Sequence, residues 1–216
     1  MKASAIIPAY NEEKNIESVL KTLVKIELLG EILVIDDGST DKTAKIAKEY
    51  GVKVISMGEN VGKGGAMMQG VNLAASEYLL FLDADLIGLT EYHINNLLDP
   101  IIQEGYMMSI GVFEKGRLAT DLAQFVAPFL SGQRAVRKEL FSKICNLDAT
   151  RFGVEVALTK YTKDNKIPIK EVILKDMTHV MKEEKMGLIK GFVARMKMYW
   201  EIAKFVSIDI KNEMRD

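Results

Sequence analysis

Short apolar runs alternate with segments of helical periodicity through the first half of the chain. The runs predict strands at Ala3–Ile7, Glu31–Ile35, Lys53–Met57 and Tyr78–Leu82. One helix face is marked by Ile16, Val19, Leu20, Leu23 and Val24, and a second by Ala44, Ile46, Ala47 and Tyr50. This alternation is typical of strands joined by crossover helices. We therefore expect an α/β fold with a mostly parallel sheet that is flanked by helices.

The pattern becomes mostly helical in the second half. Two further strands are predicted at Met107–Phe113 and Ile169–Leu174. Helices are predicted at Lys138–Ile144, Val154–Tyr161 and Gly187–Ser207. At 216 residues, without an internal repeat or a linker, the chain predicts one domain that spans residues 1–216.

The composition limits which binding partners and which cellular compartment are expected for the protein. Lys+Arg 29 against Asp+Glu 30 gives a net charge of -1, so no overall positive field favours nucleic acid. Cys145 is the only cysteine, so it has no partner for an internal disulfide, which fits a reducing cytoplasm. No apolar run reaches the roughly 18 residues of a membrane span, and no leader with a cleavage site precedes the first strand. We expect a cytoplasmic protein.

A polar turn follows each of the first four predicted strands. The turns read PAYNEE, DDGSTD, GENVGKGG and DADL. Each could be an ordinary strand end or helix cap, because Asp, Asn, Gly and Glu favour such places. Ligands of open α/β sheets, however, bind at the carboxyl ends of the strands. Four such turns on one edge therefore predict a ligand site there.

The DADL turn supplies two carboxylates, from Asp83 and Asp85. Oxygen ligands of this kind suit Mg²⁺ or Mn²⁺, which takes one or two protein carboxylates and completes its shell with phosphate oxygens and water. A diphosphate leaving group could supply those oxygens, and the metal would stabilise its developing charge. The alternative is a solvated turn.

The second and third turns offer an acid and a cation. Asp36 and Asp37 precede a glycine, and one of these carboxylates could accept from a ribose hydroxyl or a base imide. Lys63 lies in a glycine-rich helix entry, which fails the Walker pattern because no Ser or Thr follows the lysine. An approach to a base or a diphosphate and a plain helix entry both stay open.

The set IIPAYNEEKNI, DDGSTD, NVGKGGAMMQG and FLDAD resembles the nucleotide-binding half of family 2 glycosyltransferases, with the A-type glycosyltransferase fold. The resemblance implies a nucleotide-sugar-binding half at residues 1–113 and an acceptor half at 114–216. It implies that Pro8, Tyr10 and Glu12 line the uracil or ribose pocket and that Asp37 faces the base. Lys63 would approach the nucleotide. Asp83 would contact ribose and metal, and Asp85 the metal itself.

The second half is similar to glucosyl-3-phosphoglycerate synthases and their relatives. The similarity lies in SGQRAVRK, FGVE and THV. It implies acceptor contacts at Gly132 and Arg134, a catalytic or sugar-site role for Glu155, and His179 as a third metal ligand. The chain departs from that group in reading Ser-Gly-Gln where a Gly-Gly-Glu-like loop is usual, and Phe152 where Tyr is common.

These later residues also have plainer interpretations. Glu155 could occupy the favourable first turn of its helix, and His179 could be a hydrogen-bonded core or surface histidine. Arg134, Arg137 and Lys138 could form a solvated face or bind a phosphate-bearing acceptor. The apolar stripe from Leu188 to Val206 could pack on the catalytic domain or a second subunit, or rest on an anionic membrane.

The function predicted from the sequence is transfer of a hexose from a UDP- or GDP-sugar to an unidentified acceptor. A small phosphorylated metabolite such as 3-phosphoglycerate and a polyprenyl phosphate are both candidate acceptors. The stereochemical outcome is open, because most family 2 members invert and the phosphoglycerate group retains. A non-catalytic binder of sugar nucleotides and a nucleotidyltransferase are the competing classes.

Overall fold

The computed structural model describes residues 1–113, 131–144 and 154–179. These residues belong to one compact unit of the chain, Met1–His179. The predicted helix at Gly187–Ser207 and the stripe from Leu188 to Val206 lie outside the described residues. That residues 1–216 form a single domain therefore stays a prediction.

The apolar runs of the sequence form a seven-stranded sheet in the order β3-β2-β1-β4-β7-β6-β8. Its strands are β1 (Ala3–Ala9), β2 (Leu29–Asp36), β3 (Lys53–Ser56), β4 (Tyr78–Phe81), β6 (Met108–Phe113), β7 (Arg134–Arg137) and β8 (Ile169–Leu174). Neighbouring strands pair in parallel except at β7, which runs antiparallel to both β4 and β6. The predicted α/β class with a mostly parallel sheet is confirmed.

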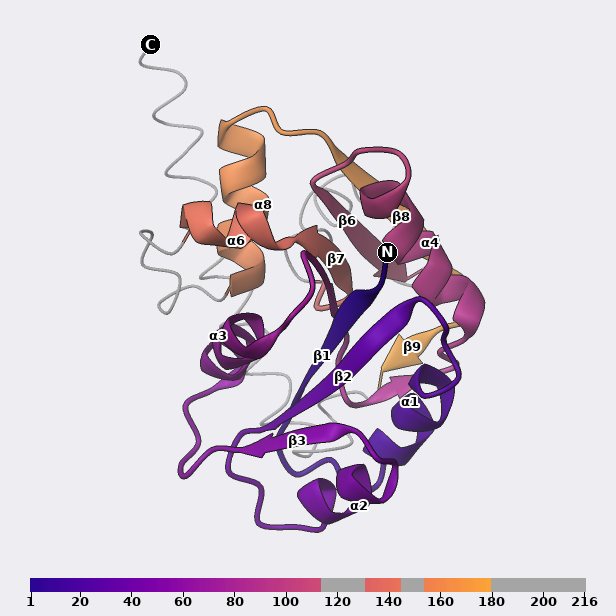
Figure 1. Ribbon diagram of the computed structural model, residues 1–216, viewed down its shortest axis with the longest axis vertical. Helices are drawn as coiled ribbons and strands as arrows, with labels where there is room; N and C mark the ends of the chain where they lie inside the picture. Colours follow the sequence, from indigo (N-terminus) through magenta and orange to yellow (C-terminus); the bar gives the residue numbers. More distant parts are fainter. Residues whose placement is uncertain (114–130, 145–153, 180–216) are drawn as a thin grey trace, which may run out of the picture. The chain divides into compact units, whose positions relative to one another are not determined.

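Helices cover both faces of this sheet (Figure 1). They are α1 (Ile16–Leu23), α2 (Thr43–Glu49), α3 (Lys63–Leu73), α4 (Glu91–Ile102), α6 (Lys138–Ile144) and α8 (Val154–Asp164). Side chains alternate along β1, so Ala5 and Ile7 pack with α1 and α4, whereas Ile6 packs with α3. Burial on both faces explains why β1 and β4 read as continuous apolar runs.

All six predicted strands are present, with ends shifted by up to two residues. The helix at Lys138–Ile144 is also confirmed, and the helix predicted from Val154 continues to Asp164. Strand β7 was not predicted. A small two-stranded sheet of β5 (Leu86–Ile87) and β9 (Thr178–His179) was not predicted either.

The direction of β7 matters for the site. Its first residue, Arg134, pairs with Phe81 at the end of β4. Because β7 is antiparallel to β4, the segment that leads into β7 arrives where the parallel strands β1, β2 and β4 end. Residues 131–133 therefore reach the same edge of the sheet as the polar turns.

Candidate active site

The turns after β1 and β2 are joined to each other by hydrogen bonds. Asn11 has a positive φ of 54°, and this turn places its carboxamide beside the second turn. Five bonds from a backbone amide to a side chain cross between the turns: Asn11 N to Ser39 Oγ, Thr40 N to Asn11 Oδ1, Glu12 N to Thr43 Oγ1, Glu13 N to Asp41 Oδ2, and Lys42 N to Glu13 Oε2. Much of the polarity of PAYNEE and DDGSTD therefore fixes the backbone of the two turns.

Asp37 fixes the third turn. The residue is 3% exposed, and its two carboxylate oxygens accept from Val61 N at 2.8 Å and Gly62 N at 2.9 Å. Asn60 Nδ2 also donates to the backbone oxygen of Asp37 at 3.2 Å. The carboxylate thus bonds directly to the loop that precedes Lys63, the first residue of α3. A direct contact of Asp37 with a base stays a prediction.

Lys63 joins two carboxylates that are remote in the sequence. Its Nζ lies 2.7 Å from Asp83 Oδ1, beyond the end of β4, and 2.7 Å from Glu155 Oε1, in the first turn of α8. Gln133 Nε2 donates to the other oxygen of Asp83 at 2.8 Å. The side chains of Asp83 and Glu155 are 28% and 14% exposed, and that of Lys63 is 43% exposed. These residues form a charged cluster at the carboxyl edge of the sheet.

Gly132 lies against this cluster. A Cβ built on Gly132 would lie 2.5 Å from Lys63 Nζ and 2.6 Å from Asp83 Oδ2. Only a residue without a side chain lets the backbone approach the ion pair so closely. The structure therefore brings together Lys63, Asp83, Gly132 and Glu155, four residues that the sequence analysis had singled out separately.

Arg134 is fully buried, with 0% exposure. Its guanidinium donates to Ser131 O, Glu155 O and Thr159 Oγ1. The sequence predicts a contact with an acceptor or a solvated face, but the observed partners are groups of the protein. This buried position is a difference from that expectation, and a solvated face is excluded for this residue.

The charges within the cluster shift the pKa values of its members. Burial favours the neutral form of Glu155, but the positive charges of Lys63 and Arg134 outweigh it and lower the pKa of the carboxyl. Burial likewise opposes the charge of Lys63, but Asp83 and Glu155 raise the pKa of its ammonium. Burial lowers the pKa of Arg134 to about 10, and attraction to Glu155 and Asp83 limits the fall. All three groups are charged at neutral pH.

The remaining predicted residues lie around this edge. Pro8 is half-buried, Tyr10 is 48% exposed, and Glu12 accepts from Asn15 Nδ2 at 2.8 Å. Asp85 is half-buried and precedes β5. The backbone of His179 pairs with Leu86, the residue that follows Asp85, so the sheet of β5 and β9 brings position 179 beside the DADL turn.

The donor set fits a divalent cation in part. Within residues 1–113, 131–144 and 154–179, no three His, Cys, Asp or Glu side chains are grouped to hold a metal. Asp83, however, already accepts from the ammonium of Lys63, so this edge attracts positive charge. Two carboxylates also suffice for Mg²⁺ or Mn²⁺ when phosphate oxygens and water complete the shell.

Sequence reasoning missed Gln133, Ser131 and Thr159. Gln133 is 1% exposed and binds Asp83, while Ser131 and Thr159 bind Arg134. Gln133 could have been found from its place beside Gly132 in a loop that leads into a strand. Thr159 reads as an ordinary helix residue, because its role depends on a tertiary contact.

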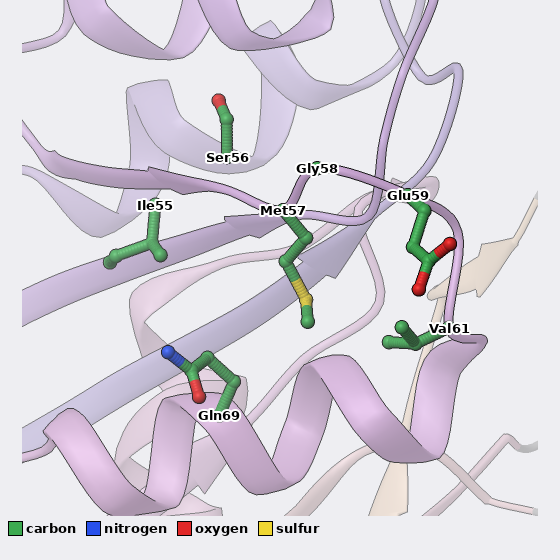
Figure 2. A pocket seen from close by; sticks show the side chains of 7 residues that line it. All are labelled: Ile55, Ser56, Met57, Gly58, Glu59, Val61 and Gln69. Carbon is green, nitrogen blue, oxygen red and sulfur yellow. The ribbon is translucent and has the colours of Figure 1, made fainter.

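A separate pocket lies beside the third turn (Figure 2). It is lined by Ile55, Ser56, Met57, Gly58, Glu59, Val61 and Gln69. None of the predicted site residues lines this pocket. The groups suited to chemistry are those of the charged cluster.

The sequence matches a known protein family. Residues 4–159 match the model of the family described as "Glycosyl transferase family 2". The chain is a member of this family, and it is therefore a glycosyltransferase.

Two relatives illustrate the similarity. An uncharacterized protein of Methanocaldococcus jannaschii is 32% identical over 89% of this chain and 89% of its own length. The 4,4'-diaponeurosporenoate glycosyltransferase of Staphylococcus aureus is 32% identical over 61% of this chain, which corresponds to 34% of that protein.

Among solved structures, the chain is similar to glucosyl-3-phosphoglycerate synthase of Mycobacterium tuberculosis. The complex of that enzyme with Mn²⁺, UDP and glucosyl-3-phosphoglycerate gives a TM-score of 0.71 at 28% identity, covering 83% of this chain and 72% of that one. Its complex with Mn²⁺, UDP-glucose and phosphoglyceric acid gives a TM-score of 0.70 at 28% identity, covering 83% of this chain and 71% of that one.

In the described part of this chain, no helix has the length and apolarity to cross a bilayer.

Proposed function

We propose that this glycosyltransferase moves a hexose from a UDP- or GDP-sugar to a small phosphorylated acceptor of the 3-phosphoglycerate type, with Mg²⁺ or Mn²⁺ as cofactor. The observation that carries the proposal is the cluster of Lys63, Asp83 and Glu155 at the carboxyl edge of the sheet. The complexes of the similar synthase with UDP-glucose, Mn²⁺ and phosphoglyceric acid support the choice of ligands.

The donor would lie across the turns after β1, β2, β3 and β4. Pro8, Tyr10 and Glu12 would line the nucleoside pocket, with Asp37 keeping the third turn in place beside it. Asp83 and Asp85, with His179 as third ligand, would hold the metal. When bound, the metal supplies Lewis-acid stabilisation of the negative charge on the leaving diphosphate.

Lys63 and Glu155 act on the reacting groups in this proposal. The Lys63 ammonium would turn toward the diphosphate and neutralise part of its charge. The ionised Glu155 carboxylate would lie near the transferred sugar, and the backbone at Gly132 would meet the acceptor. Most of the acceleration would come from positioning and from stabilisation of the leaving group.

A donor and acceptor screen tests this function. Purified protein is incubated with Mn²⁺, UDP- and GDP-sugars including UDP-glucose, and 3-phosphoglycerate, and release of the nucleoside diphosphate is measured. We expect release that requires both substrates and is abolished by EDTA. Asp85→Ala should reduce turnover about 100-fold or more, because a metal contributes several kcal/mol to the transition state.

Asp164→Ala is the matched control, because Asp164 is 54% exposed in a surface pair with Lys160. Equal, slow release by wild type and Asp85→Ala with every substrate would favour a non-catalytic binder. Release of pyrophosphate from a nucleoside triphosphate would instead identify a nucleotidyltransferase. Turnover with a polyprenyl phosphate but not with 3-phosphoglycerate would overturn the proposed acceptor class.

A further inference from the structure

Arg134 combines complete burial with a full positive charge. A guanidinium away from water is costly unless it is hydrogen-bonded and paired with negative charge. Its two Nη groups are hydrogen-bonded, Nη2 to Ser131 O at 2.5 Å and Nη1 to Glu155 O at 2.9 Å and Thr159 Oγ1 at 3.3 Å. The carboxylates of Glu155 and Asp83 attract its charge. A buried guanidinium with these bonds is suited to hold the backbone segments around it in place.

The oxygen atoms that accept hydrogen bonds from Arg134 lie in two segments that both contribute residues to the charged cluster. Ser131 O belongs to the segment whose next two residues, Gly132 and Gln133, contact Lys63 and Asp83. Glu155 O and Thr159 Oγ1 belong to the first turns of α8, from which the Glu155 carboxylate reaches Lys63. One planar, forked side chain therefore connects segments that the chain brings together only by folding.

We propose that Arg134 is a positioning residue that connects the segment 131–133 to the first turn of α8 and so sets the place of Glu155 relative to Asp83 and Lys63. Its effect on turnover rests on the function proposed above, whereas its effect on the two backbone segments does not. Arg134 itself has no exposed surface to touch a substrate. It acts through Glu155 and Gly132.

Arg137 provides a matched control on the same strand. Its side chain also bonds to a backbone carbonyl of another element, with Nε and Nη2 at 3.1 Å and 2.8 Å from Ile101 O. It lies over the ring of Tyr78, on the α4 side of the sheet and away from the cluster. Arg137→Met therefore removes a comparable anchor without touching the candidate site.

The first test is hydrogen exchange, which does not depend on catalysis. In Arg134→Met and Arg134→Lys, peptides that cover residues 131–135 and 154–160 should exchange about tenfold faster or more than in wild type. Peptides from β1 and β2 should keep their wild-type rates. Arg137→Met should leave both site segments unchanged. Unchanged exchange of these segments in folded Arg134→Lys would overturn the proposal, whatever the activity.

The second test separates positioning from binding. If Glu155 is displaced, kcat should fall about 10- to 100-fold in Arg134→Met, while KM for the donor changes less than about threefold. Arg134→Lys keeps the charge and should recover part of kcat. Equal kcat in Arg134→Met and wild type would contradict the role.

Failure of the proposed function and failure of the positioning role can be told apart. Faster exchange in the two segments without turnover by the wild type would reject the proposed function and keep the positioning role. Where Arg134→Met does not fold, Arg134→Lys and Thr159→Val carry the exchange test, because Thr159→Val removes a single acceptor of the same guanidinium.

Discussion

Charged side chains at the carboxyl edge restrain one another residue by residue. Lys63 lies between Asp83 and Glu155, Gln133 donates to Asp83, and Gly132 leaves space for the pair. In such a cluster each group depends on the place of the next, so single substitutions are expected to affect more than the group that they remove.

Gly132→Ala tests this spacing. The added methyl group would lie 2.5 Å from Lys63 Nζ and 2.7 Å from Asp83 Oδ1, so the ion pair must open to accommodate it. We expect turnover to fall about 10- to 100-fold with a loss of stability below about 1 kcal/mol, because the atoms that must move are the ends of side chains. Steady-state kinetics and thermal unfolding measure the two effects. Gly30→Ala is the control, because a Cβ there would also be crowded, at 3.1 Å from Lys2 Cβ, but near the start of β2 and away from the cluster. An equal loss of activity in both variants would contradict the spacing role of Gly132.

At the scale of elements, the site depends on how strand ends are fixed to helix starts. Asp37 accepts the amides of Val61 and Gly62 and so connects the end of β2 to the start of α3. Helix α3 is also close to the sheet, because a Cβ at Gly70 would collide with Ile6 of β1. The place of Lys63 follows from these two contacts.

Asp37→Asn tests the connection. The amide group keeps one acceptor oxygen and presents an N–H to the second loop amide, which costs about 1 to 3 kcal/mol. We expect KM for the sugar nucleotide to rise about tenfold with a smaller change in kcat. Glu31→Gln is a matched control, because Glu31 accepts from Ala75 N near the opposite end of β2. A rise in KM of the same size in Glu31→Gln would assign the effect to general loss of stability.

Some strands and helices could be predicted from the sequence and others could not, for physical reasons. Continuous apolar runs identified β1, β2 and β4 because these strands are buried on both faces. β7 was missed because RAVR begins and ends with arginine, which reads as a polar loop, and the burial of Arg134 depends on acceptors from α8. The full extent of α3 was not predicted either, since its glycines reflect close packing on β1 and break the helical pattern.

The same limit applies to the site. Asp83, Lys63 and Glu155 were found from motifs, each with a plain alternative beside it. Their direct contact could not be predicted, because it depends on β7 entering antiparallel and on α8 packing against it. Motifs reveal the chemical groups, whereas the topology determines which of them meet.

At the scale of the molecule, the cluster joins elements from both halves of the described chain. Its charges make stability depend on pH. The pKa of Glu155 is lowered in the folded state, so its contribution is present above the unfolded value of 4.5 and is lost as pH falls through the folded value. The raised pKa of Lys63 gives a contribution that is present below its unfolded value of 10.5 and is lost as pH rises through the folded value.

Glu155→Gln measures the acidic side of this dependence. At about pH 7 the wild type should be more stable by about 1 to 2 kcal/mol, a value reduced by the solvent that reaches Lys63. The difference should shrink as pH falls below 4.5. Urea unfolding of both proteins from about pH 7 to about pH 3 gives the comparison. Glu104→Gln, in an exposed pair with Lys170, should show a small difference that varies little. A constant difference for Glu155→Gln over the whole range would exclude the ionic origin.

The five hydrogen bonds from backbone amides to side chains that cross between the first two turns have an evolutionary consequence. Asn11 both donates to Ser39 and accepts from Thr40, and Glu13 both donates to Asp41 and accepts from Lys42. The donor in each bond is a backbone N–H, so the loss of one acceptor side chain leaves an amide of the other turn unpaired, and no substitution at the donor position replaces the bond. Descendant sequences are therefore expected to keep an oxygen-bearing side chain at each acceptor position, and such constancy would reflect a shared scaffold rather than a shared ligand.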